Sequence, residues 1–273
     1  MIHQRHSSIA LAILFGALTV GLPAQTPKPA VAKVDPWVKE TLKEYKKLIS
    51  DRKGMKDAAA IELVNNMLDK YETMHPKDQK AFAKGIAESL NSRRCKRKPN
   101  QAGIYRTTIK ALSMTGKNGG AHLKKAFENK SKFKGKEWVN LRGDMLEHIG
   151  RTKDERFIDF LLDIALKYPN DTLMAKAGGA LRHYKDLKLN KRKEIAKLLI
   201  KKFAAIYNNA NKNLNPGDGT VRTWQNRHAA VADPWNVSLQ ALTKQRYRSA
   251  NDWNKFWNKH KSHNWDKPLK KTR

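Results

Sequence analysis

"GRTKDERFIDFLLDIALKYPNDTLMAKAGGALRHY" spans residues 150–184 and decides the fold. Its first half places apolar residues three and four positions apart behind an acidic start, and its second half is rich in small residues and ends in Ala-Leu. That spacing is the period of an amphipathic helix. The Asn170-Asp171 pair between the two halves marks a short turn. The stretch therefore predicts two helices packed as an antiparallel pair.

The ending of the second helix recurs along the chain. The segments KALSMTG, DMLEHIG, GALRHYK and QALTKQR each end an amphipathic helix, with leucines at Leu112, Leu146, Leu181 and Leu242. These leucines lie 34, 35 and 61 residues apart. The two near-constant spacings predict repeated helix-pair units. The third spacing holds about one further helix and a polar loop at residues 208–220.

Residues 150–184 resemble a HEAT-type repeat, and the resemblance extends over roughly residues 100–203. The segment ANDWNKFWNKHK near the chain end is similar to Trp-rich closing helices of exported bacterial HEAT-like proteins. The resemblance implies an all-α, right-handed superhelical stack of antiparallel helix pairs, a HEAT/armadillo-like α-solenoid with a Trp-rich C-terminal capping helix. It also implies a protein-binding or scaffolding surface, without a cofactor and without common catalytic residues.

The first 24 residues have the layout of a secretory signal peptide. Arg5 precedes the apolar run at 9–22, and Ala24 follows as a small residue at a plausible cleavage position. The run is shorter than the roughly 20 residues that a membrane-spanning helix needs. We therefore expect an exported protein, periplasmic or extracellular, cleaved near Ala24 and without a transmembrane segment in its mature form.

The remaining chain divides by composition and periodicity. A Pro/Ala/Lys linker at 25–34 leads to N-terminal helices at 35–98, the first of which is expected to begin at Asp35 and Pro36. The HEAT-like repeats are expected at 99–246. A capping helix and basic tail follow at 247–273.

Charge is the strongest compositional signal. The chain has 56 Lys and Arg against 25 Asp and Glu, a formal net charge of +31. Such an imbalance attracts polyanions, including nucleic acid, anionic polysaccharide and acidic lipid, without selecting among them. Cys95 is the only cysteine, so an intramolecular disulfide is excluded.

Aligning the predicted repeats places equivalent positions of the second helix of each pair in rows that run from one pair to the next. One row holds Glu147 and Arg182, and the next holds His148 and His183. The predicted partner-binding surface comprises Arg106, Lys110, Asp144, Glu147, His148, Arg182 and His183. Ordinary hydrogen bonding and ion pairing between repeats explain the same pattern. Two histidines without a third ligand do not predict a metal site.

The segment RRCKRK surrounds the single cysteine with cations. It is expected to be an exposed basic loop that contacts polyanions through Arg93, Arg94, Lys96, Arg97 and Lys98. Neighbouring cations are also expected to lower the pKa of the Cys95 thiol.

The segment SANDWNKFWNKHKSHNW, residues 249–265, is expected to begin a capping helix. Trp253, Phe256, Trp257 and His260 fall on one helical face. The residues from 263 onward, including Trp265, are expected to form a free basic end. The preceding helix, which contains the DPW motif of residues 233–235, is expected to supply the surface that these aromatic side chains cover.

These features favour a secreted helical-repeat binding or scaffold protein for an acidic partner, a protein or an envelope polymer. One alternative is non-specific binding of nucleic acid or another polyanion through the basic surface. A second is a hydrolase that uses Asp144, Glu147 and His148. Phosphate-binding, zinc-protease and serine-hydrolase motifs are missing from the sequence, so no catalytic residues and no cofactor are predicted.

Overall fold

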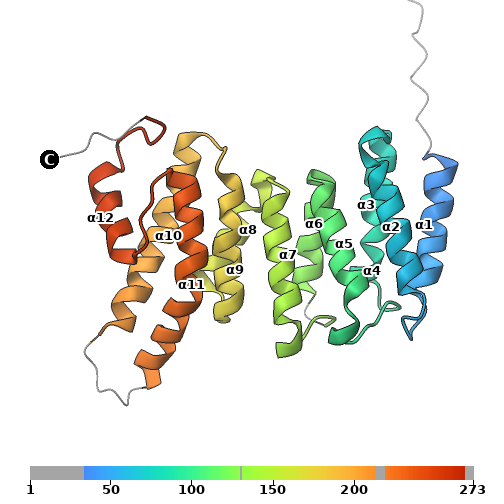
Figure 1. Cartoon of the computed structure of the whole chain (residues 1–273), viewed down its shortest axis with the longest axis horizontal. Coiled ribbons are helices and arrows are strands. Elements are labelled where there is room, and N and C mark those ends of the chain that lie inside the picture. The colour runs from blue at the N-terminus through green and yellow to red at the C-terminus, as the bar shows by residue number, and fades with distance from the viewer. Residues whose placement is uncertain (1–33, 130, 213–218, 268–273) are drawn as a thin grey trace, which may run out of the picture. The chain divides into compact units, whose positions relative to one another are not determined.

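The computed structural model describes residues 34–129, 131–212 and 219–267, which belong to one compact unit (Figure 1). The expected signal peptide, nearly all of the linker, residues 213–218 of the polar loop and the end of the basic tail lie outside these residues. All regular structure in the described part is helical. The helices are α1 Pro36–Ile49, α2 Asp57–Asp69, α3 Pro76–Ile86, α4 Glu88–Asn91, α5 Gly103–Met114, α6 Lys117–Glu128, α7 Val139–Arg151, α8 Ile158–Lys167, α9 Asp171–Ala180, α10 Leu189–Ala210, α11 Gly219–Thr243 and α12 Ala250–His260.

The helices pack in two rows (Figure 1). Helices α2, α5, α7, α9 and α11 form one row, in which each contacts the next. In the other row α1, α3 and α6 follow one another, as do α8, α10 and α12, while the rings of Phe127 and Phe160 join α6 to α8. The pairs α6/α7, α8/α9 and α10/α11 connect the rows. The predicted all-helical architecture of packed helix pairs is confirmed.

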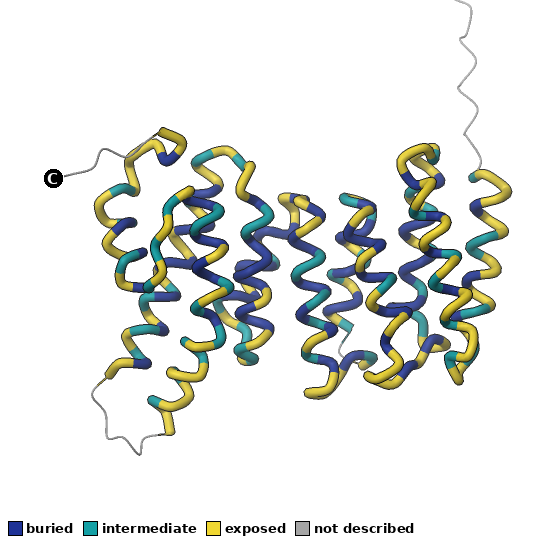
Figure 2. Tube along the Cα trace, viewed as in Figure 1, coloured by how far each residue is buried: buried dark blue, intermediate teal, exposed yellow. Residues whose placement is uncertain are grey.

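The burial pattern follows from amphipathic helices packed on two sides. Buried and exposed residues alternate along the helices (Figure 2). The expected cap is present at α1, where the Asp35 carboxylate accepts a hydrogen bond of 2.7 Å from the Trp37 amide. Ser249 caps α12 in the same way, with its hydroxyl 3.1 Å from the Asp252 amide. Both helix starts were therefore readable from local sequence.

Small residues bring α9 unusually close to α11. Gly178 of α9 lies against Trp235 of α11, and a methyl group at position 178 would overlap the indole ring. Trp235 is fully buried, and the Ser238 hydroxyl reaches the Gly178 carbonyl at 2.7 Å. The Ala- and Gly-rich sequence of α9 therefore recesses this helix between its neighbours.

Helix α11 contains the DPW motif of residues 233–235 in its interior. It begins at Gly219 and runs through Pro234. Proline inside a helix removes a hydrogen bond and costs about 3 kcal/mol. Val231, Trp235 and Leu239, on either side of the proline, are all buried. Their packing outweighs the local penalty, which the DPW motif alone does not reveal.

The C-terminal aromatic residues form one buried cluster. Trp253 and Phe256 of α12 are buried as their spacing predicted, and the ring centres of Tyr247 and Trp253 lie 5.2 Å apart. The expectation that Trp265 belongs to a free end is wrong. Trp265 is buried with its ring 5.5 Å from Phe256, because the chain turns back after α12.

An ion pair between the buried Arg192 and the exposed Asp266 holds that returning segment. The guanidinium of Arg192 in α10 donates to both carboxylate oxygens of Asp266 at 2.6 Å. Arg192 also donates to the Leu242 carbonyl at 2.8 Å. A single side chain therefore connects α10, the end of α11 and the segment after α12.

Candidate functional site

A groove of about 890 Å³ lies along α9, between α7 and α11. We call it the α9 groove. Ala175 and Gly179 of the recessed helix line it together with side chains of the two flanking helices. The charged and imidazole groups of its lining are Asp144, Glu147, His148, Arg151, Lys176, Arg182 and Asp233. Four of the seven predicted partner-binding residues are therefore brought together here.

Glu147 is the centre of a polar network in this groove. Its carboxylate accepts hydrogen bonds from Arg182, from His183 at 2.9 Å and from Arg151 at 3.3 Å. Burial alone would raise the pKa of Glu147, but the hydrogen bond from His183 and the charge of Arg182 outweigh it and hold the pKa at about 2. Glu147 of α7 thus contacts Arg182 and His183, which directly follow α9, and the proximity of Glu147 and Arg182 is the one that the alignment predicted.

His148 of α7 contacts helix α5, the preceding helix in the same row. Its Nδ1 lies 2.8 Å from the hydroxyl of Ser113, which lies 2.7 Å from the Lys110 carbonyl. Burial lowers the pKa of His148 to about 4, so the imidazole is neutral at pH 7. When the Ser113 hydroxyl donates to Lys110, its oxygen accepts the N–H of His148. In that arrangement the imidazole does not activate the serine, and Glu147, ionised and paired, provides no general base.

The charges lining the α9 groove are balanced. Among the described residues in its lining, three carboxylates face three cations. Burial raises the pKa of Asp144, against the opposing charges of Lys176 and Arg106. Arg106 and Lys110 are exposed on α5 and do not line the groove. The groove thus suits polar recognition and lacks the cationic excess that an acidic partner requires.

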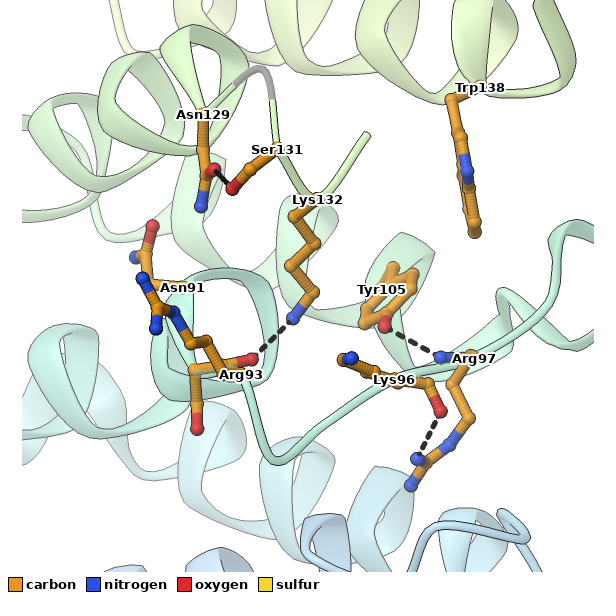
Figure 3. Close-up of a pocket in the computed structure, with 10 residues that line it drawn as sticks. Asn91, Arg93, Lys96, Arg97, Tyr105, Asn129, Ser131, Lys132 and Trp138 are labelled. Atoms are coloured by element: carbon orange, nitrogen blue, oxygen red, sulfur yellow. Dashed lines mark hydrogen bonds between the residues drawn. The ribbon is translucent and has the colours of Figure 1, made fainter. Parts of the chain in front are cut away.

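The basic segment at 93–98 divides between two adjoining clefts. Arg93 and Lys96 line a cleft of about 610 Å³, which we call the Lys132 cleft (Figure 3). Arg94 lines a smaller cleft of about 170 Å³, the Arg94 cleft, together with Lys46 and Lys47 of α1. Ser92 belongs to both linings. Lys98 is exposed and lines neither.

Arg97 and Cys95 correct the expectation of a uniformly exposed loop. The Arg97 side chain is fully buried, and its guanidinium donates to the two oxygens of Asp57 at 2.6 and 2.7 Å. Cys95 is buried beside it. Burial raises the pKa of the thiol, and the opposing effects of the cations Lys132 and Arg97 are smaller. The predicted lowering of the Cys95 pKa is therefore wrong.

Tyr105 explains why the segment turns inward. Its hydroxyl donates to the Cys95 carbonyl at 2.9 Å and accepts the Arg97 amide at 3.0 Å. Two main-chain groups of the loop are thus fixed to α5. Cys95 and Arg97 are therefore buried, while Lys96 between them remains exposed in the Lys132 cleft.

Lys132 is the residue that sequence reasoning missed. Its ammonium donates to the carbonyls of Ser89 at 2.5 Å and Ser92 at 2.9 Å. It also lies 4.9 Å from the centre of the Tyr105 ring, and both side chains are labelled in Figure 3. Burial lowers its pKa to about 8. The available sequence signal was the alternation of lysines from 130 to 136, which does not single out position 132.

No protein-family model, no curated protein and no solved structure matches the chain. Within the described ranges, none of the helices has the length and apolar character needed to cross a membrane. The same residues contain no group of three or more His, Cys, Asp or Glu side chains arranged to hold a metal ion.

Proposed function

We propose that this protein is an exported, HEAT-like α-solenoid that acts as a binding or scaffold module for an acidic partner. The repeated helix pairs and the near-constant spacing of Leu112, Leu146 and Leu181 support a right-handed superhelical array. The buried Trp253 supports α12 as the cap of this array. The apolar run before Ala24 supports export.

Partner contact is assigned to the two adjoining basic clefts, which we together call the basic edge. Seven cations and one carboxylate, Glu88, are found among the described residues that line them. The cations are Lys46, Lys47, Arg93, Arg94, Lys96, Arg97 and Lys132. Asp57 neutralises Arg97, so six cations remain for one carboxylate. This local excess carries the proposal, because it attracts a polyanion to a defined place.

The test reverses charge at the basic edge and at a matched position. The first variant combines Arg93→Glu with Lys96→Glu. The control combines Lys197→Glu with Lys201→Glu, two exposed lysines of α10, and has the same net charge. Binding to fluorescent polyglutamate and polyphosphate is measured by anisotropy at several salt concentrations.

We expect the first variant to lose at least about tenfold in affinity, which corresponds to about 1.4 kcal/mol, and the control to stay within about twofold. Equal losses in the two variants would show that net charge alone drives binding. If the wild-type protein binds neither polymer, the proposed function is wrong.

The same cations also favour nucleic acid as a second candidate partner. Roughly six phosphate contacts predict that affinity falls about 10³-fold between 50 and 200 mM salt. Labelled duplex DNA titrated across that range tests this directly. A flat salt response, or no binding at 50 mM, removes nucleic acid from consideration.

A further inference from the structure

Lys132 is a cation held inside a cleft rather than on an open surface. Two main-chain carbonyls accept its hydrogen bonds, and the rings of Tyr105 and Phe133 lie 4.9 and 5.6 Å from its nitrogen. None of the described residues that line this cleft is a carboxylate. Enclosing an ammonium without a counter-ion is unfavourable. An anion that enters the cleft would therefore gain more from Lys132 than from a solvated lysine.

The number of available cations indicates what kind of anion fits. Asp57 occupies Arg97, so Arg93, Lys96 and Lys132 remain for a ligand. One carboxylate carries a single charge and two oxygens. A phosphate ester carries one to two charges and at least two free oxygens in a tetrahedral arrangement, so it can contact donors that approach from different sides.

We propose that the Lys132 cleft is a phosphate-recognition site, which binds a phosphate group of the acidic partner between Lys132, Arg93 and Lys96. This inference rests on the proposed function and specifies the chemistry of the partner. Lys132 is the fixed contact, because its two hydrogen bonds to carbonyls hold it in place. Arg93 and Lys96 are exposed and adjust to the ligand from the loop at 93–98.

The neighbouring Arg94 cleft is a poorer candidate for the phosphate. It encloses about 170 Å³ against about 610 Å³ for the Lys132 cleft. It also contains the carboxylate of Glu88, which repels an anion. We therefore assign the phosphate to the Lys132 cleft and assign to the Arg94 cleft only long-range attraction of the polymer.

The site has a specific pH signature. Lys132 has a pKa of about 8 in the free protein, and the titratable groups around it are Cys95, Arg97 and Tyr105, with Arg93 and Lys96 in the same lining. A bound phosphate favours the ammonium form and raises the pKa of Lys132. Binding therefore takes up a proton just above pH 8. The contribution of Lys132 to affinity is constant below about pH 8 and falls by up to about tenfold per pH unit above it.

The experiment compares the full chain with Lys132→Met, which retains an unbranched apolar side chain. Lys134→Met is the matched control, because Lys134 is exposed in the same segment and lines neither basic cleft. Titration calorimetry with linear polyphosphate, polyglutamate and inorganic phosphate is run at pH 7 and pH 9. Two buffers of different ionisation enthalpy at pH 8.5 report proton uptake.

We expect the wild type and Lys134→Met to bind polyphosphate at least about tenfold more tightly than polyglutamate. Lys132→Met should bind both polymers equally. Lys132→Arg keeps a cation of high pKa, so it should bind polyphosphate without proton uptake at pH 8.5. This third variant decides the question if circular dichroism shows that Lys132→Met does not fold.

The outcomes separate this inference from the proposed function. If the polyphosphate preference and proton uptake persist without Lys132, the phosphate site is wrong while polymer binding at the basic edge stands. If inorganic phosphate binds through Lys132 but neither polymer binds, the phosphate site stands and its ligand is the free ion, while the proposed function fails.

Discussion

Removing the carboxylate of Asp57 is expected to destabilise the protein more than removing a carboxylate from an exposed ion pair. The Arg97 guanidinium is fully enclosed, and the Asp57 side chain keeps 16% of its exposure. In Asp57→Ala the cation retains only the carbonyls of Ile49, at 3.3 Å, and Lys96, at 2.9 Å. Two charge-assisted hydrogen bonds of 2.6 and 2.7 Å are lost.

The size of the loss in unfolding free energy follows from the charge of Arg97, which is left buried without a counter-ion. Removing one partner of a buried ion pair costs about 3–5 kcal/mol because the other charge is left uncompensated. The remaining carbonyls and the partial exposure of Asp57 place the expected loss at the lower end, about 3 kcal/mol. The first turn of α2 also loses a favourable negative charge, worth about 0.3–1 kcal/mol.

The assay is urea unfolding followed by far-ultraviolet circular dichroism. Asp186→Ala is the control, because its ion pair with Lys153 is 3.6 Å long with both side chains more than 60% exposed. We expect this control to lose less than about 1 kcal/mol. If Asp57→Ala and Asp186→Ala lose unfolding free energies that agree within about 0.5 kcal/mol, burial does not make the Asp57–Arg97 pair essential and the reasoning is refuted. Asp57→Ala should also weaken polyphosphate binding, since Arg97 anchors the loop at 93–98.

Three further results are expected. Gly178→Ala should cost about 1–3 kcal/mol of unfolding free energy, because the new methyl group displaces Trp235; urea unfolding measures this loss. Glu147 has a lowered pKa of about 2, so its stabilisation is complete above about pH 4.5 and is lost as the pH falls towards 2. Comparison of unfolding free energies for wild type and Glu147→Gln at pH 5 and pH 2.5 should show the difference shrink. Cys95 should react with a thiol reagent about a hundredfold more slowly in the native protein than in urea, because burial hides the thiol and raises its pKa.

The helices and their pairing were largely predictable because they depend on local sequence. The spacing of Leu112, Leu146 and Leu181 predicted helices that pack in pairs, and all three leucines are buried. Aligning these helices placed Glu147 and Arg182 at equivalent positions, and the two side chains are in contact. The place of Pro234 inside α11 was not predictable from local sequence, because buried neighbours decide whether a helix tolerates a proline.

The Lys132 cleft was not predictable because distant segments build it. Lys132 bonds to carbonyls 43 and 40 residues earlier in the chain, and Arg97 pairs with a carboxylate 40 residues earlier. These contacts turn Cys95 into the core and leave Arg93 at the surface. A run of cations in a loop therefore predicted positive charge, but not which side chains remain available to a ligand.

The charged groups of this protein have different roles, depending on whether a residue of opposite charge lies beside them. In the α9 groove, Glu147 is matched by Arg182 and His183, so these groups stabilise the contact between neighbouring helices and retain little capacity for a further charged partner. At the basic edge, Arg93 and Lys96 lie beside Lys132 with no carboxylate among the described residues of the cleft. Cations that the fold leaves unmatched gain most from an external anion. Local imbalance, rather than the net charge of the chain, is therefore the basis on which we propose where an acidic partner binds.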